Sequence, residues 1–156
     1  MNRVIAHTGA RYPIVQAPMG WIARSTLASA VSRAGGLGII EPSSGETEAC
    51  QREIRAMVAS GLPFGVNLPI RFLKDDAMLR FVCEAGIRFV TTSAGSPAKF
   101  IAPLKAAGIV VTALCPTSVD TRLLRGSGLA PETTPEEVAE AIYFLARAPG
   151  AVAGTA

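Results

Sequence analysis

Small, turn-forming residues gather where apolar runs end, and these are the places where the chain could do chemistry. Gln16-Ala17-Pro18-Met19-Gly20 follows one such run, and Asn67 stands near the end of another. Small residues let the backbone approach a flat, uncharged ring, Met19 adds a soft apolar contact, and the Asn67 amide can donate and accept hydrogen bonds. The pattern indicates binding of a heterocycle. Ordinary strand ends and loop caps use the same residue types, so a structural role is the alternative.

Groups for acid–base, nucleophilic or metal chemistry are scarce in this sequence. The one histidine, His7, precedes the first apolar run and is expected on the surface, on the side opposite the site. Cys50, Cys83 and Cys115 form no CxxC pair, which favours buried, inert thiols in a reducing compartment over a disulfide or zinc site. We therefore predict no metal site and name no catalytic residue. Redox chemistry would come from an organic cofactor.

A repeated helix–glycine–strand unit must position these residues. Apolar, β-rich runs occupy residues 12–17, 37–40, 63–68, 87–92 and 109–114, and the helical patterns between them end at Gly35, Gly61, Gly86 and Gly108. This alternation predicts an α/β fold, a partial TIM-barrel-like (β/α) array of about four to five parallel βα units. A complete eight-unit barrel needs about 250 residues, more than this chain has. In such folds ligands gather at the carboxyl ends of the strands.

Helix starts and glycine-rich turns refine this organisation. Helices are expected to begin at Ser25, at Asp75 and at Ser96-Pro97, which are typical capping residues. Gly35-Gly36-Leu37-Gly38 precedes a strand, so it indicates a helix stop and not a phosphate loop. Residues 93–97 lie between a strand and a helix, where an anion could meet helix N–H groups. They lack the glycine density and the lysine of a P-loop.

The regular spacing of the helix–glycine–strand units ends after Gly108. A long irregular stretch follows the run at 109–114, and then Thr134-Pro135-Glu136-Glu137 forms a capping box ahead of an apolar helical stripe. The spacing therefore predicts two parts, residues 1–108 and residues 109–156.

The overall composition excludes several classes of protein. Hydrophobic residues make up 49% and charged residues 17% of the chain, which is typical of a globular protein. The net charge of +3 comes from scattered residues without a basic run, so no nucleic-acid partner is expected. The apolar runs are short and the N-terminus has no long apolar core, which predicts no membrane span and a cytoplasmic location. The open sheet edges of a partial barrel favour self-association into a homo-oligomer.

The first part of the chain resembles the N-terminal part of the nitronate monooxygenase family, formerly called 2-nitropropane dioxygenases. The matching stretches within residues 12–108 are YPIVQAPMG, AVSRAGGLGII, PFGVNLPI and FVTTSAGSP. The resemblance implies an FMN-dependent TIM barrel that oxidises alkyl nitronates with O₂. It also implies that the backbone of Ala17, Pro18, Met19 and Gly20 lines the flavin ring and that Asn67 hydrogen-bonds to FMN. Thr92 to Gly95 would lie near the same pocket.

Residues 109–156 are similar to the C-terminal portion of a short-chain dehydrogenase/reductase. The similar stretches are VTALCPTSVDTRLL, TTPEEVAEAIYFLA and GAVAGTA, and the resemblance implies that Pro116 and Thr121 lie on the cofactor side. That family's GxxxGxG loop and Tyr-x-x-x-Lys pair have no match here, so we expect no complete dehydrogenase site.

Two hypotheses about function follow from these resemblances. The first is an FMN-dependent oxidoreductase of the nitronate monooxygenase type with an incomplete site, because the family's phosphate-binding Gly-rich segments and its histidine-bearing segment have no counterpart in this sequence. The second is a non-catalytic fusion or truncated remnant that folds or self-associates without turnover. The sequence leaves open whether the chain acts as an enzyme.

Overall fold

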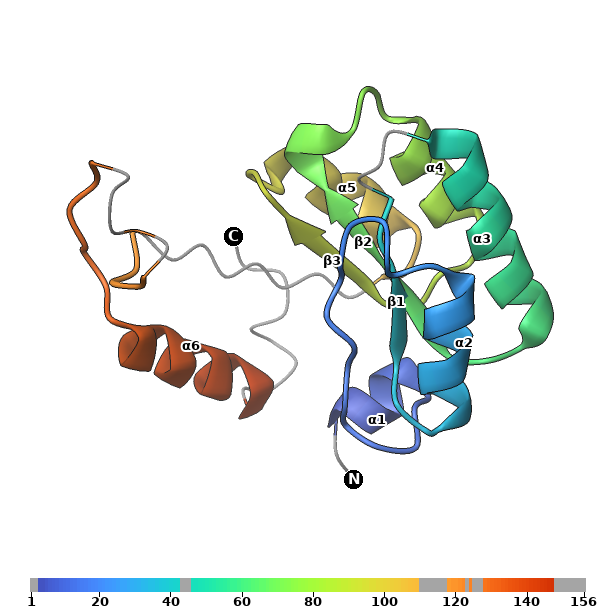
Figure 1. The fold of residues 1–156 in the computed structure, drawn as a ribbon, viewed down its shortest axis with the longest axis horizontal. Helices are drawn as coiled ribbons and strands as arrows, with labels where there is room; N and C mark the ends of the chain where they lie inside the picture. The colour runs from blue at the N-terminus through green and yellow to red at the C-terminus, as the bar shows by residue number, and fades with distance from the viewer. Residues whose placement is uncertain (1–2, 43–45, 110–117, 123, 125–127, 148–156) are drawn as a thin grey trace. The chain divides into compact units, whose positions relative to one another are not determined.

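The computed structural model describes residues 3–42, 46–109, 118–122, 124 and 128–147 (Figure 1). The chain divides into two compact units, Met1–Val110 and Val111–Ala156. The division falls two residues after the boundary expected from the spacing of the glycines. The dehydrogenase-like character of the second unit stays a prediction.

The first unit is built on a small parallel sheet. Its strands are β1 (Gly38–Ile40), β2 (Phe64–Pro69) and β3 (Val90–Ser93), hydrogen-bonded in the order β1-β2-β3. The strands expected at 37–40 and 63–68 are therefore confirmed, and the one expected at 87–92 begins later, at Val90. The fifth expected strand, at 109–114, lies almost wholly outside the described residues.

The strand expected at 12–17 is reduced to a single parallel bridge between Val15 and Leu37. The Leu37 N–H donates to the Ile14 carbonyl over 2.8 Å, and the Gln16 N–H donates to the Leu37 carbonyl over 2.9 Å. Beyond this point the Gln16 side chain takes over, because its Oε1 accepts from the Ile39 N–H over 3.3 Å and its Nε2 donates to the Ile39 carbonyl over 3.2 Å. Since Pro18 has no N–H to continue a ladder, the segment leaves the sheet here.

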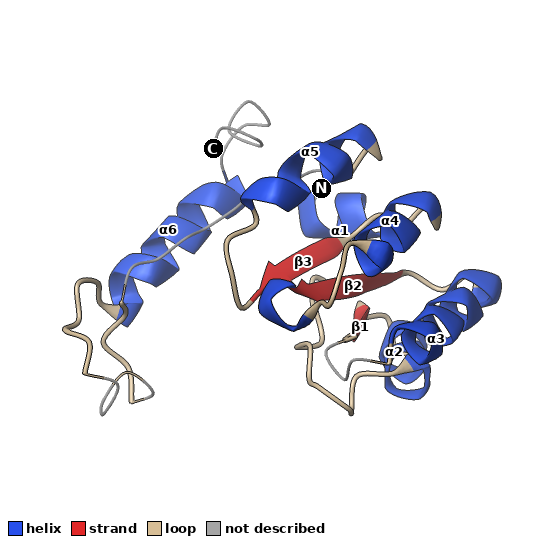
Figure 2. Ribbon diagram, turned by 90° about the horizontal axis from the view of Figure 1, so that it is seen from above, coloured by secondary structure: helices blue, strands red, loops and turns tan. Residues whose placement is uncertain are grey.

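Helices cover one face of the sheet. Figure 2 shows that they follow one another along this face in chain order: α2 (Ser25–Arg33), α3 (Thr47–Ser60), α4 (Ala77–Glu84) and α5 (Ala98–Ala106). A single turn of 3₁₀ helix, Ile70–Phe72, follows β2, and a short helix that the sequence did not predict, α1 (Arg3–Thr8), precedes the sheet. Among the described residues, no helix has the length and apolar character needed to cross a membrane.

The glycines expected to end helices all have left-handed backbones. The φ angles of Gly35, Gly61, Gly86 and Gly108 are 101°, 68°, 70° and 77°. Residues with a Cβ adopt this region reluctantly, so glycine is the favoured residue at such positions. The predicted helix stops are therefore confirmed.

The start of α2 differs from the expectation. Ser25 is the first helical residue and not the cap, and no side chain of the preceding Arg24 caps the helix. The Ser25 N–H instead donates to Glu53 Oε2 of α3 over 2.9 Å. The hydrogen bonds from Ser25 lower the pKa of Glu53, against the opposing effect of burial, and Arg24 and Arg52 add to the lowering. Asp75 precedes α4 as expected: its Oδ1 accepts from the Ala77 N–H over 2.7 Å, while Asp76 is the cap residue and makes no side-chain cap hydrogen bond.

Replacement of Glu53 by glutamine is expected to destabilise the folded chain at neutral pH by about 0.5 to 1 kcal/mol. Because the pKa of Glu53 is lowered in the folded chain, its contribution is fully present above the usual value of 4.5 and is lost as the pH falls through the lowered value. Urea unfolding at pH 7 and at pH 3 measures the difference in free energy of unfolding between the native chain and Glu53→Gln, which should be smaller at pH 3. The control is Glu84→Gln on α4, where the side chain is exposed. An equal loss at both pH values would contradict the prediction.

In the second unit the described residues contain one well-formed helix, α6 (Pro135–Arg147). The Glu137 N–H donates to Thr134 Oγ1 over 3.2 Å, and the Thr134 N–H donates to Glu137 Oε2 over 2.7 Å, which confirms the predicted capping box. The hydrogen bonds that the Thr134 backbone N–H and then its hydroxyl donate to the Glu137 carboxylate lower the pKa of Glu137. Thr121 lies in a bend, and Pro116 lies outside the described residues.

Candidate functional site

The register of the sheet brings polar side chains together at its carboxyl edge. Asn67 of β2 is paired with Thr91 of β3, and Pro69 is paired with Ser93. Because side chains alternate along a strand, Thr91 and Ser93 share one face of the sheet with Asn67. This face therefore carries Asn67 of β2 and both Thr91 and Ser93 of β3.

Glu41, directly after β1, completes this group. Gly38 faces α2, since a Cβ built on it would lie 2.2 Å from the Ala28 carbonyl oxygen. Alternation therefore turns Ile39 and Glu41 to the opposite face, away from the helices. The Glu41 carboxylate accepts a hydrogen bond from the Asn67 amide, which fixes it on the same face as Asn67.

Hydrogen bonds join these four residues, which we call the Asn67 cluster: Glu41, Asn67, Thr91 and Ser93. Asn67 Nδ2 donates to Glu41 Oε2 and to Ser93 Oγ, the latter over 3.0 Å. Thr91 Oγ1 donates to Asn67 Oδ1 over 2.8 Å. Asn67 is 1% exposed and Glu41 is 4% exposed. Buried polar groups of this kind are stable only when hydrogen-bonded, so the network holds the Asn67 amide in one place.

The segment predicted to line a ring lies beside the Asn67 cluster. Ala17, Pro18, Met19 and Gly20 are all exposed, and Met19 retains 38% of its accessible surface. The Met19 carbonyl accepts from the N–H of Ala23 over 2.9 Å, which closes a tight turn. We call residues 17–20 the rim. It presents exposed backbone and an apolar side chain at the edge where Asn67 and Glu41 are buried.

Strained backbone marks the same edge. Trp21 and Ala94 have φ angles of 66° and 56°, and among the described residues they are the non-glycine residues with positive φ. Trp21 follows the rim and is 68% exposed, and Ala94 follows β3. Left-handed conformations of non-glycine residues cluster at ligand sites, where the surrounding structure enforces them. Their shared location supports the carboxyl edge as the functional one.

The register turns one of the residues predicted together, Thr92, away from Asn67. Thr92 pairs with Leu68, so it lies on the face of the sheet opposite Asn67, and Thr91 takes the position against Asn67. Gly95 lies exposed in the loop after β3, where a Cβ would be 3.2 Å from Ile70. The Ala94 carbonyl accepts from the Arg71 N–H over 3.2 Å, which joins the loops after β2 and β3.

The sequence did not single out Glu41 or Thr91 as site residues, and it placed Ser93 near the pocket only as part of the range Thr92 to Gly95. A usable signal existed for Thr91 and Ser93. Side chains two residues apart on a strand lie on the same face, so if one of them faces Asn67 the other does too. For Glu41 the signal was an acidic residue placed immediately after the fully apolar run Leu37–Ile40. An acid in that position is shielded from water unless the chain turns outward.

The other groups that could do chemistry are His7 and the cysteines. His7 is half-buried in the last turn of α1. Cys50 is fully buried with Arg24 Nη1 2.5 Å from its sulfur, and burial raises the pKa of the half-buried Cys83, with Glu84 adding to the effect. Cys115 lies outside the described residues. Within the described part of the chain, no group of three His, Cys, Asp or Glu side chains could hold a metal ion.

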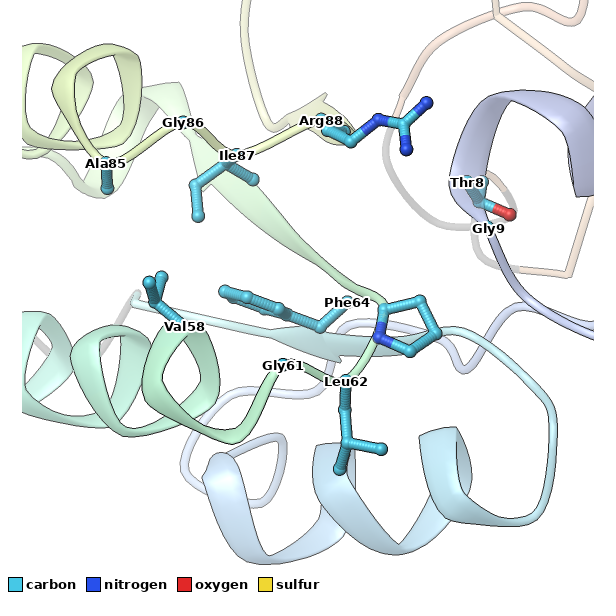
Figure 3. A pocket seen from close by; sticks show the side chains of 11 residues that line it. Thr8, Gly9, Val58, Gly61, Leu62, Phe64, Ala85, Gly86, Ile87 and Arg88 are labelled. Carbon is cyan, nitrogen blue, oxygen red and sulfur yellow. The ribbon is translucent and has the colours of Figure 1, made fainter.

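A surface groove of about 370 Å³ lies at the opposite, amino edge of the sheet (Figure 3). Residues that precede β2 and β3 line it, together with the end of α1. Figure 3 shows apolar side chains, those of Val58, Phe64 and Ile87, at one end and Arg88 and Thr8 at the other. In parallel α/β folds ligands bind at the carboxyl edge, so this groove is separate from the Asn67 cluster and the rim.

These features define a class of protein: a parallel βα array, helices on one face, with a polar cluster and an exposed backbone rim where the strands end. The sequence model of nitronate monooxygenases matches residues 2–80 of the 156. The chain belongs to the nitronate monooxygenase family, whose members are oxidoreductases of the flavin type. The resemblance drawn from the motifs in residues 12–108 is thereby confirmed.

Individual relatives cover most of the first unit. A (3aS,4S,5R,7aS)-5-hydroxy-7a-methyl-1-oxo-octahydro-1H-indene-4-carboxyl-CoA dehydrogenase from Mycobacterium tuberculosis is 33% identical over 106 residues, which are 66% of this chain and 29% of that protein. A nitronate monooxygenase from Pseudomonas aeruginosa is 44% identical over 63 residues, 38% of this chain and 17% of that protein. The structure of FabK from Thermotoga maritima is similar with a TM-score of 0.66 and 34% identity, over 71% of this chain and 36% of that one. The chain thus spans about a third or less of the length of each.

Proposed function

We propose that the carboxyl edge of the first unit binds FMN and that the chain serves the oxidation of alkyl nitronates by O₂. The observation that carries this proposal is the Asn67 cluster, in which the buried Asn67 amide is hydrogen-bonded to buried Glu41, half-buried Thr91 and exposed Ser93, at the edge that also carries the exposed rim. A flat heterocycle needs close backbone contact along one side and a fixed polar group at its edge. Family membership supports the choice of a flavin.

The residues present fit the ring of a flavin. The backbone of the rim would line the ring, and Met19, 38% exposed, would pack against its apolar part. Both hydrogens of the Asn67 amide are engaged, so Asn67 would accept a hydrogen bond through Oδ1. A bound flavin supplies electron transfer from the nitronate and reaction with O₂. Since a nitronate is already an anion, no side chain has to remove a carbon-bound proton first.

Titration of FMN with the purified chain, followed by quenching of flavin fluorescence, tests the proposal. We expect saturable one-to-one quenching at micromolar concentrations, with riboflavin binding similarly if the ring provides most of the contact. Arg88→Ala is the matched control, because Arg88 is an exposed cation at the opposite edge that could attract the phosphate nonspecifically. Binding lost in Arg88→Ala, or no saturation by about 100 μM, would overturn the proposal. Oxygen consumption with an alkyl nitronate then tests turnover.

A second candidate function is self-association without turnover. Ile14 and Val15, at the edge of the sheet beside β1, are 63% and 41% exposed. Apolar side chains along an open sheet edge favour pairing with another chain. Sedimentation velocity would distinguish this candidate: a dimer that binds FMN but consumes no oxygen favours it, and a monomer that turns over the nitronate excludes it.

A further inference from the structure

We propose that Glu41 is the positioning residue of the site and that its carboxylate sets the direction in which the Asn67 amide faces. This inference rests on the proposed function, in which Asn67 contacts the flavin. It assigns the orientation of that contact to a residue that the ring itself need not touch.

The chemistry of the Asn67 cluster singles out Glu41. The hydroxyls of Thr91 and Ser93 can each donate or accept a hydrogen bond, so either would pair with an Asn67 amide turned either way. A carboxylate can only accept. The Asn67 Nδ2 must therefore face Glu41, and Oδ1 must face Thr91, as the structure has them. Glu41 removes the second orientation.

Burial strengthens the preference for this orientation of the Asn67 amide. Glu41 is 4% exposed and Asn67 is 1% exposed, so water does not compete effectively for either group. If the amide were reversed, Oδ1 would face the carboxylate, and two acceptors would meet in a buried place without a hydrogen between them. Unpaired buried acceptors are costly, and the cost rises when one is charged. The reversed orientation is thus excluded while Glu41 is a carboxylate.

Glu41 also holds the rim through its backbone. Its N–H donates to the Ala23 carbonyl over 3.0 Å, and the Ala23 N–H in turn donates to the Met19 carbonyl over 2.9 Å. One residue therefore connects the turn that ends the rim to the amide of Asn67. The two parts of the proposed ring site are aligned through Glu41. With both Asn67 hydrogens engaged, the capacity left for a ligand is one lone pair of Oδ1, which suits a ring N–H.

The test compares Glu41→Gln with the isosteric exchange Glu41→Gln/Asn67→Asp. Glutamine can present either an oxygen or an NH₂ to Asn67, so the single variant no longer excludes the reversed amide. The double variant restores one donor and one acceptor between the two positions but reverses their polarity. We expect FMN affinity to fall about tenfold in Glu41→Gln. In the double variant the carboxylate at position 67 keeps an acceptor for the ring N–H and is again paired with a donor at position 41, so we expect the unfolding midpoint and the FMN affinity to recover together.

A second measurement reads the amide without any flavin. The Asn67 side-chain NH₂ signals of the ¹⁵N-labelled full chain are assigned by their loss in Asn67→Asp. We expect two well-separated, slowly exchanging signals in the native chain, a merged or doubled set in Glu41→Gln, and native signals in Thr91→Val. Glu84→Gln, which removes an exposed carboxylate from α4, is the control for loss of charge.

These readouts separate the two proposals. Native-like Asn67 signals in Glu41→Gln, their loss in Thr91→Val, or a double variant that regains stability without regaining FMN affinity would each overturn the role of Glu41. If the native chain binds no FMN, the proposed function fails, and the flavin-free NH₂ signals still decide whether Glu41 sets the amide. Should Glu41→Gln not fold, the double variant Thr91→Val/Ser93→Ala gives the decision, because only an amide held by Glu41 keeps its signals when both hydroxyl partners are removed.

Discussion

Replacement of Gly38 by alanine is expected to destabilise the first unit by about 3 kcal/mol or more. The added Cβ would lie 2.2 Å from the Ala28 carbonyl oxygen and 2.5 Å from the Ala28 Cα. Both are backbone atoms of α2 packed on β1, so the clash can be relieved only by moving the helix off the sheet. Urea unfolding monitored by circular dichroism measures the loss. Low yield of folded protein would agree with it.

The control for this prediction is Gly61→Ala. Gly61 has a φ of 68°, and a Cβ there would meet no atom within 4 Å. The variant therefore isolates the cost of the left-handed backbone, about 1 kcal/mol. A loss in Gly38→Ala no greater than that in Gly61→Ala would show that α2 moves away from β1 at little cost, contrary to the packing described here.

Replacement of Asn67 by alanine is expected to lower the affinity for FMN by about a hundredfold. The change removes the predicted ring contact, and it also deprives Glu41 of the amide donor inside a buried network. Both the FMN affinity from the fluorescence titration and the midpoint of unfolding should therefore fall. The measurement is the ratio of FMN dissociation constants in native and variant chains, at a temperature where both are folded.

Arg88→Ala again serves as the control, since it alters an exposed residue at the amino edge of the sheet. Its FMN dissociation constant should match that of the native chain. An Asn67→Ala variant that stays folded and binds FMN with native affinity would show that the ring lies elsewhere. The proposed site would then be wrong even though the family is right.

The parallel architecture could be predicted from the sequence because its determinants are local. Gly35, Gly61, Gly86 and Gly108 end helices through left-handed backbones that glycine adopts readily, and all four have positive φ. The apolar runs that follow them then have to be buried, which places β1 and β2. The start of α2 could not be predicted, since the acceptor for the Ser25 N–H comes from Glu53, 28 residues further along the chain.

The site was predictable only as far as strand order allows. The edge on which Asn67 and the rim lie follows from the rule for parallel sheets. Which of two adjacent threonines faces Asn67 depends on the register between β2 and β3, and the pairing of Asn67 with Thr91 turns Thr92 away. The shortening of the first strand depends on the Gln16 side chain, which satisfies both peptide groups of Ile39. The sequence pattern gives no sign that the side chain of Gln16 forms these bonds, so Gln16 was expected to be an ordinary strand residue.

The use of the Gln16 side chain in place of backbone hydrogen bonds has a consequence for the mobility of this segment. The segment that carries the rim is held at the sheet edge by a few backbone hydrogen bonds, to Gly35, Leu37 and Glu41, and by the side-chain amide of Gln16. Such a segment can detach locally without breaking the pairing of β2 with β3, because stability is distributed unevenly over a fold. A ligand seated on the rim would hold the segment down. Ligand affinity and the protection of residues 12–16 from amide exchange therefore both depend on the equilibrium between the attached and the detached segment.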